Sequence, residues 1–107
     1  MKPIDMIDDD DVFNTLYDAA ETYGAQKQFL MAIEEMSELT KEICKWYRGK
    51  DTRDRIAEEM ADVYIMLTQM QIILKNTGKI EDWIKKKAMR LQKRLDGVLA
   101  LKGEQNA

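Results

Sequence analysis

Apolar residues recur at spacings of three and four along most of the chain, which is the pattern of α-helices with one buried face. They predict four helices: a first through Val12 and Ala20 to Gly24, a second from about Gln26 to Tyr47, a third from near Thr52 to Gly78, and a fourth from about Ile80 to Gly97. No sustained alternation of apolar and polar positions predicts a strand. The pattern therefore predicts an all-α fold with short loops between the helices.

Polar residues stand where two of these helices are expected to begin. Asp9 or Asp10 is placed to cap the first helix, and Asp51 or Thr52 is placed to cap the third. The chain has a single proline, Pro3, so glycines mark the ends of the predicted helices. Residues 103–107 are expected to form a loose C-terminal tail.

A chain of 107 residues has the length of one domain, and we expect a single helical domain over residues 1–102. Two of its predicted helices exceed about 20 residues, or roughly 30 Å. Helices this long in so short a chain bury little area against one another. We therefore predict a four-helix, bundle-like protomer that is completed by oligomerisation as a homo-oligomer.

Composition excludes several kinds of chemistry. The chain has no histidine and one cysteine, Cys44, which excludes internal disulfides and histidine-dependent catalysis and makes a structural zinc site very unfavourable. No apolar run reaches the roughly 18 residues of a membrane span, so no membrane partner is expected. Residues 1–5 lack the basic start and apolar stretch of a secretory signal, which favours a cytoplasmic location.

Charge divides the chain into an acidic and a basic part. Residues 1–74 carry 8 Lys and Arg against 16 Asp and Glu, whereas residues 75–102 carry 9 Lys and Arg against 3 acids. The net charge of −3 and the acidic helices argue against nucleic acid as a partner.

The third predicted helix places carboxylates where a core is expected. On a helical projection Glu59 falls inside the apolar arc and Asp62 falls at its edge, whereas Glu58 points to the polar side. Burial of an unpaired carboxylate costs several kcal/mol, so such residues usually have a cationic partner. Because they are three residues apart, Glu59 and Asp62 can reach one ion together.

The second predicted helix carries a matching acidic side, made by Glu34, Glu35, Glu38 and Glu42. Like charges four residues apart destabilise an isolated helix by about 0.2–0.5 kcal/mol per pair. One interpretation is an exposed, solubilising face, and the other is a set of ligands. Oxygen ligands without nitrogen or sulfur suit hard cations, so the second interpretation predicts Mg²⁺, or alternatively Mn²⁺.

The two acidic segments resemble a known motif. Glu34-Glu35-Met36-Ser37-Glu38, followed by Glu59-Met60-Ala61-Asp62, is similar to the EExxE…ExxD pattern of MazG-like nucleoside triphosphate pyrophosphohydrolases. The resemblance implies an all-α fold that dimerises, often as a dimer of dimers, and Mg²⁺-dependent hydrolysis of an NTP or dNTP to the monophosphate and pyrophosphate. Carried over by position, it implies the metal ligands Glu35, Glu38, Glu59 and Asp62. It also implies Glu34 as an accessory acid, which acts either as a further ligand or in orienting the attacking water, so Glu34 and Glu35 are the candidate catalytic residues.

The basic fourth helix and one aromatic residue complete the expected site. The resemblance implies that Lys87 and Arg94, two turns apart, hold phosphates; Leu91 stands where many members have an asparagine. An exposed basic face is the competing interpretation of this helix. Trp46 lies on the acidic side of the second helix and is the candidate for stacking on a nucleobase.

A function of another class remains open at this point. The chain is alternatively a non-catalytic helical interaction module whose acidic face contacts a basic partner. Binding of Mg²⁺ distinguishes the two, because an ion that binds only the folded protein raises its melting temperature.

Overall fold

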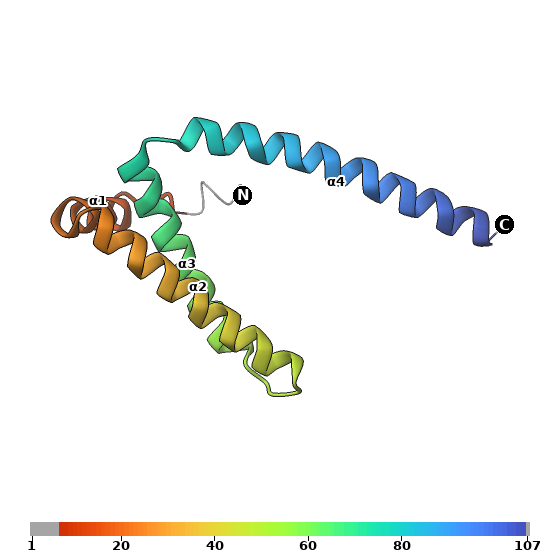
Figure 1. Ribbon diagram of the computed structural model, residues 1–107, viewed down its shortest axis with the longest axis horizontal. Coiled ribbons are helices and arrows are strands. Elements are labelled where there is room, and N and C mark those ends of the chain that lie inside the picture. Colours follow the sequence, from red (N-terminus) through yellow and green to blue (C-terminus); the bar gives the residue numbers. More distant parts are fainter. Residues whose placement is uncertain (1–6, 107) are drawn as a thin grey trace. The chain divides into compact units, whose positions relative to one another are not determined.

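The structure, a computed structural model, describes residues 7–106 and is helical over 89% of them, with no strand in this part of the chain. Its helices are α1 (Asp10–Tyr23), α2 (Ala25–Tyr47), α3 (Arg53–Leu74) and α4 (Thr77–Asn106) (Figure 1). The prediction of an all-α chain with four helices is confirmed. The expectations drawn from residues 1–5 and from Ala107 lie outside the described residues.

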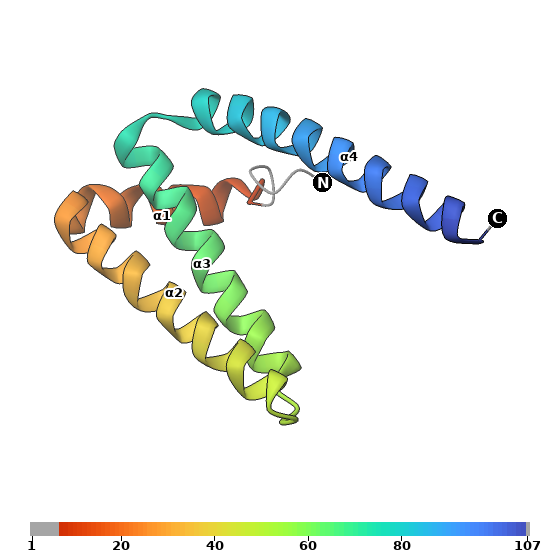
Figure 2. The ribbon, with the colours of Figure 1, turned by 45° about the vertical axis from the view of Figure 1, so that its right-hand side comes forward.

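The chain divides into two compact units, residues 1–75 and residues 76–107. The first unit contains α1, α2 and α3, and the second consists of α4. In the first unit α2 and α3 run side by side in opposite directions, and α1 contacts both of them (Figure 2). The predicted domain over residues 1–102 spans both units.

The predicted capping residues Asp9 and Thr52 make different side-chain hydrogen bonds at the starts of α1 and α3. Asp9 caps α1, because its carboxylate accepts hydrogen bonds from the backbone N–H groups of Asp11 and Val12 at 2.9 and 3.1 Å. Thr52 precedes α3, but its hydroxyl donates to the carbonyl oxygen of Glu42 at 2.9 Å instead of capping its own helix. This bond joins the start of α3 to the end of α2.

Two predicted helix ends are wrong. The third helix ends at Leu74, where Lys75 adopts the left-handed conformation with φ 52°, and Gly78 lies in the first turn of α4. Gly97 lies inside α4, and the helix continues through the predicted loose tail to Asn106. A glycine inside a helix costs only about 1 kcal/mol relative to alanine, and no proline follows, so nothing local stops α4 at Gly97.

Both polar and apolar side chains are buried on α2 and α3, and several of their large apolar side chains are exposed. Buried residues of these helices include Gln28, Ala32, Glu42, Met66 and Gln69. By contrast, 44–57% of the surface of each of five large apolar side chains on α2 and α3 is exposed: Ile33, Met36, Ile43, Met60 and Leu67. A large part of the apolar arcs predicted from the sequence is therefore exposed in the single chain.

No helix in the described part of the chain combines the length and apolar character that crossing a bilayer requires.

Candidate metal site between α2 and α3

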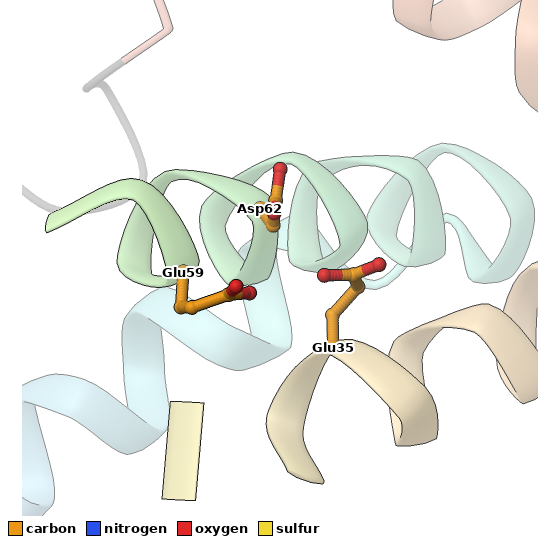
Figure 3. A group of neighbouring side chains, drawn as sticks. All are labelled: Glu35, Glu59 and Asp62. Carbon is orange, nitrogen blue, oxygen red and sulfur yellow. The ribbon is translucent and has the colours of Figure 1, made fainter. Parts of the chain in front are cut away.

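Three carboxylates from two helices meet where α2 lies beside α3. Glu35 extends from α2 toward Glu59 and Asp62 of α3 (Figure 3). One oxygen of each side chain lies within 4.8 Å of the other two, and all three residues are half-buried. Because Glu59 and Asp62 are three residues apart, they project from the same side of α3 on adjacent turns. The structure thus brings together three of the four predicted metal ligands.

One oxygen of this group lacks any partner. Glu59 Oε2 is shielded from solvent and has no hydrogen-bond donor. A buried carboxylate oxygen without a donor is costly, because folding removes its water and supplies nothing in return. A cation bound beside Asp62 and Glu35 would supply the missing interaction.

Burial and mutual repulsion raise the pKa of two of these carboxyl groups. Desolvation raises the pKa of Glu35 above its ordinary value, and the charge of Asp62 and a hydrogen bond to its carboxyl raise it further. Desolvation likewise raises the pKa of Glu59, followed by the charges of Asp62 and Glu38. Each raised pKa means that the ionised form is unfavourable here unless positive charge is added.

The other acids of α2 lie around this group in different ways. Glu34 and Glu38 are exposed, and Glu38 is close enough for its charge to raise the pKa of both Glu35 and Glu59. Glu42 is buried and pairs with Lys45 at 3.2 Å between Oε1 and Nζ. An internal cation therefore already neutralises Glu42, whereas the described part of the chain shows no ion pair at Glu35, Glu59 or Asp62.

The predicted substrate-binding residues are exposed. Lys87 and Arg94 lie on α4, seven residues and hence two turns apart, and belong to the second unit. Trp46 lies near the end of α2 with 54% of its surface exposed. Their roles toward phosphate and base stay predictions.

The donor set fits a hard divalent cation. It consists of carboxylate oxygens on two helices, which suits Mg²⁺ or Mn²⁺ better than softer metals. An Mg²⁺ ion usually keeps several waters and takes one or two carboxylates, so three protein oxygens within 4.8 Å are sufficient. The unpartnered Oε2 of Glu59 is consistent with such an occupant.

A polar neighbour of the site was missed by the sequence analysis. Gln28 is buried and shares with Glu35 and Asp62 the lining of a cavity of about 200 Å³. The available signal was its spacing, because Gln28, Glu35 and Glu42 are seven residues apart and share one face of α2.

No protein-family model matches the chain, and comparison with curated proteins and with solved structures gave no match.

Proposed function

We propose that the protein is a Mg²⁺-dependent pyrophosphohydrolase, which converts a nucleoside triphosphate to the monophosphate and pyrophosphate in the cytoplasm. The observation that carries this proposal is the group of three half-buried carboxylates, one of which has an oxygen without a partner. Its support from the sequence is the similarity of Glu34–Glu38 and Glu59–Asp62 to the MazG-like motif.

In this proposal the carboxylates bind the cation, and their negative charge makes the cation necessary for binding of the substrate. A triphosphate carries several negative charges and is repelled by an acidic group of this kind, so it binds only with Mg²⁺. The bound ion would neutralise charge on the phosphate oxygens and favour attack by water. Glu35, Glu59 and Asp62 are its ligands, and Glu38 is exposed beside them as the fourth.

Proton transfer falls to a glutamate, because the chain has no histidine. Glu34 is exposed one residue before Glu35 on α2 and is our candidate for orienting the attacking water. Lys87 and Arg94 are our candidates for holding phosphates, and Trp46 is our candidate for stacking on the base. We propose that the active form is a homo-oligomer, either a dimer or a tetramer.

Release of pyrophosphate from a panel of NTPs and dNTPs, with Mg²⁺ and with a chelator, tests the proposal. We expect chelator-sensitive release from at least one triphosphate and loss of activity of at least about 100-fold in Glu59→Gln. Glu58→Gln is the matched control, because Glu58 is the exposed neighbour on the same helix and should keep its activity. Folded protein that binds Mg²⁺ but releases no pyrophosphate from any substrate would contradict the proposal.

A further inference from the structure

A buried salt bridge lies on the same face of α2 as the carboxylate group. Glu42 has only 5% of its surface exposed, and its Oε1 lies 3.2 Å from Nζ of Lys45, three residues further along the helix. Glu35 and Glu42 are seven residues apart, which is close to two helical turns. A buried carboxylate depends strongly on its partner, because loss of the partner leaves an uncompensated charge. Lys45 therefore decides whether Glu42 is a neutralised or a free charge.

The charge of Glu42 reaches the proposed metal ligands. Desolvation and the charge of Asp62 are the main causes of the raised pKa of Glu59, and the charges of Glu38 and Glu42 add to them. Glu38 lies four residues before Glu42, on the adjacent turn of the same side of α2. Glu42 lies outside both motif segments, so the resemblance assigns it no role.

A free carboxylate at Glu42 would change what the site binds. Together with Glu38 and Glu59 it would offer oxygen ligands for a second divalent cation, and the two cations of paired sites lie about 3.5–4 Å apart. The ammonium group of Lys45 prevents this, because it donates a hydrogen bond to one oxygen of Glu42 and cancels the charge.

We propose that Lys45 is an internal counter-ion of the metal site, which withholds Glu42 from cation binding and limits the site to one divalent cation. The inference rests on the metal site of the proposed function. Lys45 is a positioning residue in this arrangement, because it acts through Glu42 and contacts neither the cation nor the substrate.

The number of bound cations tests this role without any measurement of hydrolysis. The full chain is titrated with Mn²⁺ in the absence of nucleotide, and electron paramagnetic resonance counts the free ions and detects magnetic coupling between neighbouring bound ions. We expect one uncoupled ion in the wild type and two coupled ions in Lys45→Met, which frees a carboxylate. Lys45→Arg should restore one ion. Lys41→Met, which removes a lysine at an exposed position of α2, is the matched control and should bind one ion.

A second measurement keeps the proposal testable if Lys45→Met does not fold. Glu42→Gln removes the carboxylate and leaves the positive charge of Lys45 without its partner, so calorimetric titration should show about tenfold weaker binding of one Mg²⁺. The double variant Glu42→Gln, Lys45→Met removes both charges and should return the affinity to that of the wild type. A purely structural role would not give this compensation.

The outcomes separate this inference from the proposed function. One bound ion in Lys45→Met, a second ion without coupling to the first, or unchanged Mg²⁺ affinity in Glu42→Gln would overturn the role of Lys45 and leave the proposed function intact. Two coupled ions in the wild type would overturn it as well. A wild type that binds no divalent cation would contradict the metal site itself, and with it both proposals.

Discussion

The close approach of the carboxyl groups of Glu35, Glu59 and Asp62 requires a physical explanation. Three acids that place oxygens within 4.8 Å of one another repel, and their partial burial weakens the screening by water. Glu42 shows the alternative on the same helix, since Lys45 neutralises it internally. Three acids without a cationic partner, beside one that has such a partner, form a group that could bind a metal ion.

Removal of one of these acids should stabilise the protein without Mg²⁺ and destabilise it relative to the wild type when Mg²⁺ is bound. Without the ion, Glu59→Gln should raise the melting temperature, because it removes repulsion from Asp62 and Glu38 and a buried oxygen without a partner. With Mg²⁺ at about 100 times its dissociation constant, the free energy of unfolding of the wild type should rise by about 2.7 kcal/mol. That of the variant should rise little or not at all. Thermal unfolding with Mg²⁺ and with chelator measures both effects. In Glu58→Gln the Mg²⁺ response should be unchanged, and an equal response in Glu59→Gln would contradict the metal site.

Acidity of the same group predicts how stability depends on pH. The pKa values of Glu35 and Glu59 are raised above the ordinary glutamate value of 4.5, mainly by desolvation. The folded chain therefore keeps protons that the unfolded chain has released, and their contribution to stability is lost as pH rises from about 4.5 through the raised values. In chelator, the melting temperature of the wild type relative to Glu59→Gln should fall over this range. A rise over the same range would contradict the assignment.

At the residue scale, the sequence predicted the acids but not their full surroundings. Spacing of three on one helix was enough to place Glu59 and Asp62 together, and a polar position inside an apolar arc was enough to single them out. The participation of Glu35 needed the resemblance, because a single helix gives no reason to prefer it to Glu34. Gln28 was missed because the unsatisfied oxygen of an amide depends on which backbone carbonyl its nitrogen reaches, and that carbonyl belongs to α1.

At the element scale, the helices were predictable and their ends were not. Each helix has 14 to 30 residues, so its apolar periodicity is recognisable even where single positions depart from it. The sequence pattern therefore predicted all four helices. A helix end depends on one or two residues and on what they contact. Lys75 ends α3 in a left-handed conformation that usually favours glycine or asparagine, so its sequence gave no signal.

The two kinds of glycine position predict opposite effects of alanine. Gly97 lies inside α4 with nothing within 4 Å of an added Cβ, so Gly97→Ala should stabilise the helix by about 1 kcal/mol. Gly24 separates α1 from α2 at φ 80° and ψ 166°, a conformation that essentially only glycine adopts, so Gly24→Ala should destabilise the first unit by roughly 1–3 kcal/mol although its Cβ is also unobstructed. Urea unfolding followed by circular dichroism compares them. Destabilisation by Gly97→Ala would contradict a continuous α4.

At the scale of the whole molecule, the sequence does not indicate which surface covers its apolar arcs. The pattern predicted the arcs from their period, and the length of the helices predicted that oligomerisation covers part of them. In the structure Glu35 and Asp62 meet between α2 and α3, and the amides of Gln28 and Gln69 donate to carbonyl oxygens of α1. By contrast, Ile33, Met36 and Leu67 are exposed. Exposed apolar residues that gather on one face mark a surface that can bind another molecule. Sequence periodicity cannot distinguish a core from an interface, because both are apolar.

A second copy of the chain is the partner that we propose for this apolar face, and substitution in one groove tests it. The apolar groove between α2 and α3 is lined by Leu39, Met60, Val63, Tyr64 and Leu67. Leu67→Lys should raise the dissociation constant of the oligomer at least about 100-fold, because burial of an unpaired charge costs several kcal/mol. Leu30→Lys is the control, since Leu30 is nine residues from Leu39 and hence on the opposite side of α2. Sedimentation equilibrium should show a dimer or tetramer for wild type and Leu30→Lys and a monomer for Leu67→Lys. A wild type that stays monomeric at high concentration would contradict the homo-oligomer and would leave the exposed apolar face without a partner of its own kind.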